Sequence, residues 1–403
     1  MDKVLIIMCS VFSVVSTVYG IYFAIVSCFA LRKTIEFPEQ QEKKKFAILI
    51  PARNEESCIA GIVESILTQD YPRELVDIYV IPNNCTDHTS DAAKRAGAKI
   101  LNVSHTVHSK GHALHEAFEQ LLRTEDHDAY CVFDADNELS RTFLLEMNKA
   151  LASARVAKSR ILAKNPHDSW VCGCYDIFFC NANLLLNRAR HKLGLSARLI
   201  GTGFAVRRDL MMELGGWNTD TLTEDAEFYA NLSVRGEKIA FVPNAVTYDE
   251  EPLSFRQSLL QRRRWMSGIM EVSKRKSSAL MRSLFCDGRW LSFDCLAQLT
   301  FAFFQAWMIP VFLISQLLHF RSMPIDLPLS IATFYVSTFS VGFISVLFEK
   351  RLTRKTTISL LLYPLFVFSF LPLQTLSLVL PNKQWKPIVH TGVRLRHRVV
   401  GDQ

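Results

Sequence analysis

One feature constrains this chain of 403 residues more than any other: four long stretches contain no Asp, Glu, Lys or Arg. One lies near the start of the sequence and three lie in its last third, at residues 4–31, 295–320, 327–348 and 356–380. A bilayer core about 30 Å thick is crossed by about 20 helical residues, so each stretch is long enough to span a membrane. A soluble protein and a disordered protein are therefore both excluded.

The basic residues around the first stretch predict the orientation of the chain. Its apolar length far exceeds the roughly 7 to 15 residues of a cleaved signal peptide. Arg32, Lys33 and the lysines at 43–45 follow the stretch, whereas only Asp2 and Lys3 precede it. Because positive residues collect on the cytoplasmic side of a membrane, we expect the N-terminus outside and the middle of the chain in the cytoplasm.

The fourth stretch conflicts with a full crossing. Pro364 and Pro372 interrupt its helix, since proline cannot donate the backbone hydrogen bond. A crossing would also place the basic residues of the tail outside, and these are Lys383, Lys386, Arg394, Arg396 and Arg398. We therefore expect this stretch to lie bent at the cytoplasmic interface, which gives three spans and a cytoplasmic tail.

The chain divides into six expected segments: a first span at 1–33, a cytoplasmic α/β domain at 46–250, interfacial helices at 251–290, two spans at 291–348, a proline-broken interfacial segment at 349–380 and a tail at 381–403. The net charge of +7 sits largely in short blocks beside the apolar stretches. This is typical of membrane topology and anionic lipid, and it argues against nucleic acid as a partner. The ten cysteines include no CxxC pair, so neither a zinc site nor a disulfide framework is indicated.

In the central region, short apolar runs alternate with amphipathic stretches. The runs at 46–50, 76–81, 99–103 and 130–133 have the composition of buried strands, and helices are expected between them. Strict alternation predicts a doubly wound α/β fold, whose ligands bind at the carboxyl ends of the strands. The polar residues of the region gather at those ends.

Two carboxylates follow the apolar run at 130–133. Asp134 leaves the end of this strand, and Asp136 lies two residues further on, on the same side. Carboxylates so placed can hold a hard divalent cation, with a diphosphate supplying further oxygen ligands. Asp-x-Asp alone is more often a solvated turn, and its place at a strand end favours the metal site.

Other polar residues at the strand ends suit a nucleotide. Asn54 and Glu55 follow the first strand and Asn83 and Asn84 follow the second; these residues could contact a base and ribose, or cap helices. Lys110 opens an expected helix, where the free amides and the helix dipole add to its charge in favouring a phosphate. A solvated turn is the alternative interpretation of Lys110.

Two later motifs are candidates for acceptor chemistry. Glu224 and Asp225 lie in the first turn of an expected helix, where a carboxylate could act as general base for a sugar hydroxyl, although helix capping is the simpler explanation of this motif alone. Gln261, Arg264 and Trp265 belong to a Gln-Arg-Arg-Arg-Trp sequence, whose arginines could neutralise a diphosphate and whose indole could stack on a sugar. An interfacial basic helix with an aromatic anchor would have the same composition.

Taken together and in this order, the motifs resemble those of family 2 glycosyltransferases, the membrane-embedded inverting enzymes that include hyaluronan, chitin, cellulose and poly-N-acetylglucosamine synthases. The resemblance covers about residues 46–265 and rests on seven motifs: Pro51-Ala52-Arg53-Asn54-Glu55, Gln69-Asp70-Tyr71-Pro72, Lys110-Gly111, Asp134-Ala135-Asp136, Gly201-Thr202-Gly203, Thr223-Glu224-Asp225 and Gln261 to Trp265. It implies a GT-A, Rossmann-like α/β domain with transmembrane helices, a UDP-sugar donor and Mg²⁺ or Mn²⁺.

The resemblance also implies roles for individual residues. Asp134 would contact the nucleotide, Asp136 would bind the metal and Asp225 would be the general base. Further positions match motifs that hold the donor or the acceptor, and these are Gly203, Glu224, Gln261, Arg264, Trp265 and, in the tail, Thr391. Where the family usually has a uracil-binding aspartate, Asn83 or Asn84 stands here, and an amide can still pair with the imide edge of uracil.

On this basis we expect a multi-pass enzyme of the cell (plasma) membrane that transfers a sugar from a UDP-sugar to a growing β-linked surface or capsular polysaccharide. Three spans are few for a polymer channel, so such a synthase would need to form a homo-oligomer. Two alternatives stay open: a non-processive enzyme that adds one sugar to a lipid-linked acceptor, and a non-catalytic membrane sensor of nucleotide sugars.

Overall fold

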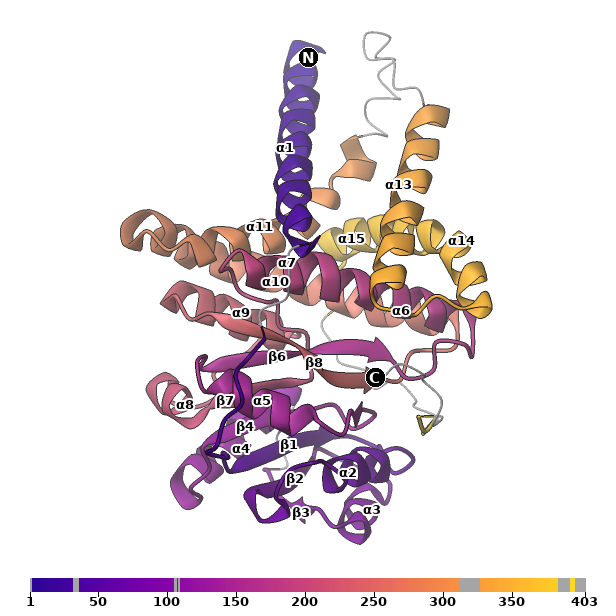
Figure 1. Ribbon diagram of the computed structural model, residues 1–403. Coiled ribbons are helices and arrows are strands. Elements are labelled where there is room, and N and C mark those ends of the chain that lie inside the picture. The colour runs from indigo at the N-terminus through magenta and orange to yellow at the C-terminus, as the bar shows by residue number, and fades with distance from the viewer. Residues whose placement is uncertain are drawn as a thin grey trace.

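The computed structural model describes residues 2–31, 36–104, 107, 109–311, 327–382 and 392–395. Figure 1 shows an α/β domain at one end of the molecule and a layer of helices that lies across it. Two long helices, α1 (Asp2–Cys28) and α13 (Leu327–Phe348), project from this layer on the side away from the domain.

The α/β domain is built on one eight-stranded sheet with the order β3-β2-β1-β4-β7-β6-β8-β5. Its strands are β1 Phe46–Ala52, β2 Val76–Pro82, β3 Lys99–Ile100, β4 Ala129–Val132, β5 Glu138–Leu139, β6 Val156–Ala163, β7 Phe204–Arg207 and β8 Ile239–Asp249. Its helices are α2 Ile59–Leu67, α3 Thr89–Ala96, α4 Lys110–Thr124, α5 Phe143–Leu151, α8 Arg208–Leu214 and α9 Glu224–Arg235.

Strand β1 explains why the first half of the sheet is recognisable from the sequence. Phe46, Ile48 and Ile50 pack into the core that includes α2 and α5, whereas Ala47 and Leu49 pack into the core that includes α4 and α9. All five side chains are fully buried. A strand covered on both faces is a continuous apolar run in the sequence, and the runs predicted as strands at 46–50, 76–81 and 130–133 are confirmed.

The second half of the sheet departs from the predicted strict alternation of parallel strands and helices. Strands β3, β2, β1 and β4 are parallel, but β7 runs antiparallel to both β4 and β6, and β5 runs antiparallel to β8. Strand β5 has two residues, and a strand this short has no apolar run by which to predict it. The sheet is therefore mixed, and it is doubly wound only in its first half.

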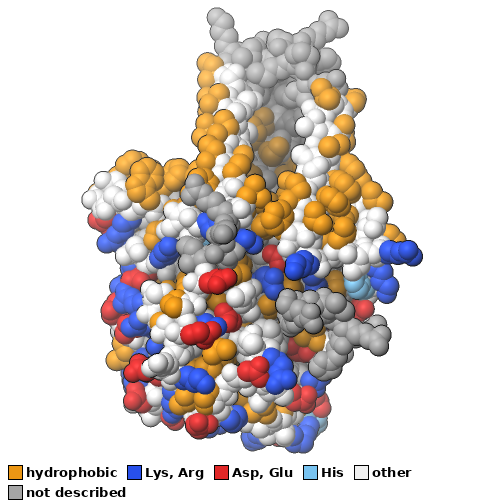
Figure 2. Space-filling view, viewed as in Figure 1, with side chains coloured by type: hydrophobic (Ala, Val, Ile, Leu, Met, Phe, Trp, Pro, Cys, Tyr) orange, Lys and Arg blue, Asp and Glu red, His pale blue; other side chains and the backbone are white. Residues whose placement is uncertain are grey.

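In the part of the chain that the structure describes, the layer between the domain and the projecting helices contains α6 Trp170–Asn181, its π-helical continuation Ala182–Arg188, α7 Ala189–Lys192, α10 Phe255–Asp287, α11 Trp290–Gln305, α14 Arg354–Phe368 and α15 Phe370–Val379. Figure 2 shows hydrophobic side chains gathered on this layer and on the projecting helices, and interspersed acidic and basic side chains on the domain. This distribution is that of a domain lying against a membrane.

Buried polar contacts join the projecting helix α1 to the layer and the helices of the layer to one another. Arg190 of α7 pairs with Asp294 of α11 at 3.0 Å, and Asp294 also accepts a hydrogen bond of 2.5 Å from the Tyr22 hydroxyl of α1. Arg262 of α10 is fully buried and donates 3.1 Å to the backbone carbonyl of Phe366 in α14. A buried charge is stable only when it is paired or hydrogen-bonded, so these contacts fix how the helices are placed over the domain.

Among the residues that the structure describes, three helical segments are long and apolar enough to cross a membrane by length and composition: Ser10–Leu31, Pro328–Phe348 and Arg354–Val379. The first two match predicted spans. The predicted span at 295–320 is described only in part, and its helix α11 lies in the transverse layer (Figure 1). The third segment is the one expected at the interface, and its helices α14 and α15 also lie in that layer (Figure 1). Which segments cross the membrane stays a prediction.

Candidate active site

Lys110, Asp134 and Gly201 meet at the carboxyl end of β4. The ammonium of Lys110 lies 2.5 Å from Oδ1 of Asp134, 2.6 Å from the carbonyl oxygen of Gly201 and 3.6 Å from Oε1 of Glu224. Burial lowers the pKa of Lys110, but the charges of Asp134, Glu224 and Asp225 raise this pKa above its ordinary value. The lysine is therefore a fixed cation at the start of α4, a place suited to a phosphate.

Asp225 lies against the same loop. Its Oδ2 accepts a hydrogen bond of 2.7 Å from the backbone N–H of Gly201. Gly201 thus contacts Asp225 through its N–H and Lys110 through its carbonyl oxygen. The structure brings together Asp225, Glu224, Lys110 and Asp134, residues that the sequence predicts for one site, although they are spread over more than 100 positions of the chain.

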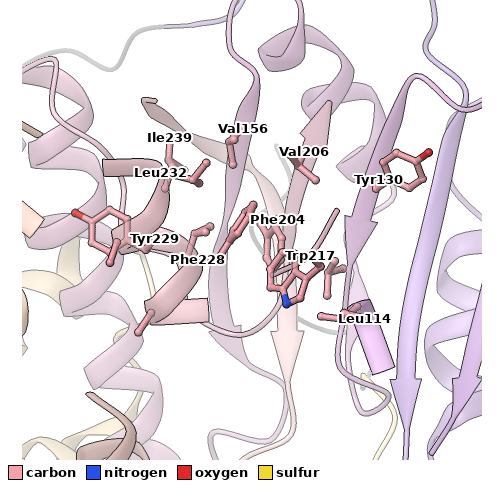
Figure 3. Close-up of a cluster of buried hydrophobic side chains, with 14 of the residues drawn as sticks. Leu114, Tyr130, Val156, Phe204, Val206, Trp217, Phe228, Tyr229, Leu232 and Ile239 are labelled. Atoms are coloured by element: carbon pink, nitrogen blue, oxygen red, sulfur yellow. The ribbon is translucent and has the colours of Figure 1, made fainter. Parts of the chain in front are cut away.

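Aromatic packing fixes the start of α9, the helix that carries Asp225. Trp217 is fully buried and stacks on Phe228 of α9 and on Phe204 of β7, with 4.2 and 5.8 Å between ring centroids (Figure 3). Within the described chain, the side chain of Thr223 makes no capping hydrogen bond to this helix. The capping explanation of the motif is therefore wrong, and the acids of the first turn are held by the Gly201 loop and Lys110.

Asp136 is buried beneath the strand end. Its Oδ2 accepts a hydrogen bond of 3.2 Å from the Glu250 N–H, and its Oδ1 lies 3.4 Å from the amide nitrogen of Asn137. Burial raises the pKa of nearby Asp249 well above its ordinary value, and the charges of Asp136 and Asp134 raise it further. Carboxylates that repel one another in this way suit a divalent cation with oxygen ligands, such as Mg²⁺ or Mn²⁺.

The protein alone does not complete such a metal site. In the part of the chain that the structure describes, no three His, Cys, Asp or Glu side chains are grouped as metal ligands. The Asp134 and Asp136 carboxylates would therefore share the cation with oxygens of a bound diphosphate, which is usual for Mg²⁺. The residues present fit a metal that arrives with its nucleotide.

The predicted base-binding residues lie at the ends of β1 and β2. Asn83 is buried, and its side-chain oxygen has no hydrogen-bond partner among the described residues. Asn54 accepts a hydrogen bond of 2.8 Å from the Thr86 N–H, and Asn84 donates one of 2.7 Å to the carbonyl oxygen of Val107. Because a buried acceptor without a partner is costly, Asn83 is the amide most suited to receive a base.

Glu55 and the tail lie at the same edge of the domain. The N–H of Glu55 donates 2.9 Å to the hydroxyl of Thr89, which joins the starts of α2 and α3. In the tail, the N–H of Val393 donates 3.2 Å to Glu250, and Arg394 pairs with Glu64 at 2.9 Å. Thr391, the tail residue predicted to hold the donor or the acceptor, lies outside the described residues, whereas Arg394 is described.

The side chains of the Gln-Arg-Arg-Arg-Trp motif on α10 point in different directions. Gln261 accepts a hydrogen bond of 2.9 Å from the Tyr175 hydroxyl, and Trp265 packs edge-on against the same ring at 6.1 Å between centroids. Arg264 faces the site: burial lowers its pKa, and the carboxylates of the site oppose this effect. Arg262 is the arginine that binds α14 and plays a structural role.

Sequence reasoning misses two residues of the site, Asn137 and Lys158. For a third, Gly203, it predicts a binding role and misses the role of packing. The side-chain oxygen of Asn137 accepts 3.1 Å from the Asp134 N–H, and its amide donates 2.9 Å to Asp249. Lys158 lies in β6 beside Ser159 and Arg160, so the local sequence does not single it out. Gly203 has φ +65°, and a side chain there would collide with hydroxyls of β6 and β8, so packing alone requires a glycine.

Glu224 makes the stability of the protein depend on pH. Burial raises its pKa to about 7, Lys110 lowers it and Asp225 raises it. An unfolded Glu has a pKa of about 4.3, so the folded state binds this proton more tightly and loses stability as the pH rises from about 4.5 to about 7. The melting temperature of Glu224→Gln minus that of wild type should therefore be larger at about pH 8 than at about pH 5. An equal difference at both values would contradict this assignment.

Comparison with known proteins connects this geometry to a family. The family described as "Glycosyltransferase like family 2" matches residues 43–268, which include the loop at Gly201, the strand-end acids and the motif on α10. The chain belongs to glycosyltransferase family 2. This family 2 glycosyltransferase is 30% identical over 244 residues to a probable glycosyltransferase of Bacillus subtilis, a match that covers 58% of this chain and 57% of that protein.

Two other relatives have more specific names. A beta-monoglucosyldiacylglycerol synthase of a Nostoc species is 26% identical over 263 residues, which cover 63% of this chain and 54% of that protein. A cellulose synthase catalytic subunit of Pseudomonas fluorescens is 23% identical over 294 residues, which cover 70% of this chain and 38% of that protein. The aligned region thus spans about half the length, or less, of these curated relatives.

A solved structure extends the likeness to the whole chain. A mannosyltransferase of Pyrobaculum calidifontis, in complex with GDP-Man and Mn²⁺, superposes with a TM-score of 0.64 at 17% identity. The superposition covers 95% of this chain and 99% of that chain. The predicted α/β, GT-A fold is confirmed by this superposition, and the predicted membership of glycosyltransferase family 2 is confirmed by the family match.

Proposed function

We propose that this glycosyltransferase moves a sugar from a UDP-sugar to a lipid-borne acceptor at the cytoplasmic surface of the membrane, in a single inverting displacement. The observation that carries the proposal is the pair of contacts made by Gly201, whose N–H binds Asp225 and whose carbonyl oxygen binds Lys110. A candidate base for the acceptor and a candidate cation for the leaving diphosphate are held on one loop.

The residues of the site divide the chemistry between them. Asp225 takes the proton from the acceptor hydroxyl while that oxygen attacks the anomeric carbon of the donor, and the bond between this carbon and the diphosphate breaks. Lys110 and Arg264 offset the negative charge that develops on the departing UDP. A divalent cation held by Asp134 and Asp136, when bound, supplies Lewis-acid stabilisation of the same diphosphate.

The side-chain oxygen of Asn83 supports uracil as the base of the sugar nucleotide. Uracil presents both a donor and acceptors on its imide edge, and the amide of Asn83 can match either. Its unpartnered oxygen would accept the imide N–H. The mannosyltransferase with the same overall fold was solved with GDP-Man, so a guanine nucleotide is the alternative that an experiment must include.

The membrane helices favour a lipid acceptor over the growing polysaccharide that the sequence predicts. Helices α1 and α13 project separately from the transverse layer (Figure 1), and only 11% and 17% of their most apolar windows are buried within the described structure. A polymer path needs helices packed around it, and these two present most of their surface to lipid. A beta-monoglucosyldiacylglycerol synthase among the relatives agrees with this choice.

We also infer three crossings, with the tail in the cytoplasm. Val393 and Leu395 bind Glu250 and Glu138 through backbone N–H groups, each at 3.2 Å, so the tail lies on the same side as the domain. The number of crossings between α10 and the tail must therefore be even. A reporter inserted between α11 and α13 should lie outside the cell and one fused to the C-terminus inside; the opposite result at either position would contradict the topology.

The product distinguishes the candidate functions. Purified protein with a radiolabelled UDP-sugar, Mn²⁺ and membrane lipid should yield label that extracts into organic solvent and migrates as one species. A ladder of products on a gel would instead support the extension of a polysaccharide. Saturable binding of UDP-sugars without release of UDP would support a sensor.

A further inference from the structure

Lys158 is a charged residue in the middle of β6 that the proposed mechanism does not use. Its side chain is fully buried, and its ammonium donates 2.9 Å to the carbonyl oxygen of Thr202 and 3.4 Å to that of Gly203. Among the described residues, no carboxylate lies close enough to form an ion pair with it. A buried ammonium without a paired carboxylate is costly, so the complete burial of this side chain requires an explanation.

The loop that Lys158 binds is the one that joins the two halves of the site. The Gly201 N–H donates 2.7 Å to Asp225, and the Gly201 carbonyl accepts 2.6 Å from Lys110. At the other end of the loop, the Gly203 N–H donates 2.9 Å to the carbonyl oxygen of Val132 in β4. Between these contacts, the described protein offers one donor to the Thr202 carbonyl, and that donor is Lys158.

Gly203 makes this contact decisive for the shape of the loop. Its φ of +65° is open to glycine, whose backbone moves between conformations at little steric cost. Without Lys158, the Thr202 carbonyl would be buried without a partner. The Gly203 N–H of the same peptide is held by Val132, so a displacement of the whole loop, not a rotation of this one peptide, would relieve that cost. Such a displacement would also move the Gly201 groups that hold Asp225 and Lys110.

We propose that Lys158 is a positioning residue for sugar transfer: it holds the Gly201-Thr202-Gly203 loop in the conformation that directs Asp225 toward the acceptor and Lys110 toward the diphosphate. The inference rests on the proposed function, because it concerns the same base and the same phosphate-binding lysine. Lys158 acts through the loop and does not touch the substrate. Burial lowers the pKa of Lys158, and the charges of Asp249, Asp225 and Asp134 raise it.

Two substitutions of Lys158 distinguish a role in positioning the loop from a role in packing. Lys158→Met keeps the length of the side chain but removes every donor, whereas Lys158→Gln keeps an amide donor for the Thr202 carbonyl. A misplacement of about 1 Å in a catalytic group can cost about 100-fold in rate. We therefore expect Lys158→Met to lower kcat by about 10- to 100-fold with KM for the UDP-sugar within about threefold of wild type, and Lys158→Gln to recover a large part of kcat.

A stability-matched control lies on the same strand. Ile161 is buried in β6, and Ile161→Val should lower the melting temperature modestly without touching the loop, so its kcat should equal that of wild type. Hydrogen exchange at the Gly201 N–H should be faster in Lys158→Met than in Ile161→Val.

Three results would overturn the inference: wild-type kcat in Lys158→Met, equal kcat in the Met and Gln variants, or losses of kcat that follow the melting temperature in all three variants. If Lys158→Met does not fold, Lys158→Gln is compared with Ile161→Val instead. A lower kcat together with faster exchange at the Gly201 N–H would support the inference, and kcat and exchange equal to those of Ile161→Val would overturn it. Absence of transfer by the wild-type protein with every nucleotide sugar would instead refute the proposed function.

Discussion

Replacing Asp225 by Asn is expected to lower kcat for sugar transfer by about 100-fold or more while leaving UDP binding within about twofold of wild type. General-base catalysis contributes about 10²- to 10⁴-fold to a rate, so kcat should fall by that factor. UDP binding should survive because Lys110 and Asp134 keep their own contact at 2.5 Å, and the Asn side-chain oxygen can still accept from the Gly201 N–H. Steady-state kinetics and titration with UDP measure the two quantities separately.

The control for this variant is an acid of the same domain that lies away from the site. Asp209 is a partly exposed residue of α8 that pairs with Arg207 at 2.6 Å, and Asp209→Asn should have wild-type kcat. Comparable activity in purified Asp225→Asn and wild-type protein would refute Asp225 as the base. A joint loss of transfer and UDP binding would show that Asp225 supports the fold of the donor site.

Replacing Asp136 by Ala is expected to remove activity and its dependence on metal together. Metal ions contribute several kcal/mol to the stabilisation of a departing diphosphate, so we expect a loss of at least about 100-fold in kcat at saturating Mn²⁺. The neighbouring acids Asp134 and Asp249 remain, but the carboxylate beside the Glu250 N–H is gone. Activity measured against Mn²⁺ concentration, with and without EDTA, checks this expectation.

Asp70→Ala provides the comparison for the metal variant. Asp70 is an acid paired with Arg141 at 2.9 Å, far along the chain from the strand-end carboxylates, and its loss should leave the Mn²⁺ titration unchanged. Asp136→Ala could instead keep an activity that EDTA abolishes and that needs the same Mn²⁺ concentration as wild type. This result would show that another group binds the metal.

Much of the fold could be predicted from the sequence because β1, β2 and β4 are covered on both faces. Each is a continuous apolar run, and the helices between them have regular apolar spacing. Strands β5 and β7 could not be predicted in this way. They are short, and β7 is paired antiparallel by neighbours, β4 and β6, that lie far from it in the sequence, so local pattern does not determine their direction.

The same distinction applies to the site. Asp134 and Lys110 were identifiable because a polar residue at the end of an apolar strand or the start of a helix stands out locally. Lys158 and Asn137 act through contacts with backbone groups that are distant in the sequence or with acids brought close by folding. The role of Arg262 was hidden for the same reason, because α14, to which it binds, follows about 100 residues later.

The release of UDP from a panel of UDP- and GDP-sugars tests the central claim most directly, since it measures activity and donor class in one assay. The purified protein, in detergent with Mn²⁺ and extracted membrane lipid, should release UDP from one UDP-sugar, and this release should disappear with EDTA and in Asp225→Asn. Release of GDP from a GDP-sugar, or UDP release that Asp225→Asn retains in full, would contradict the account.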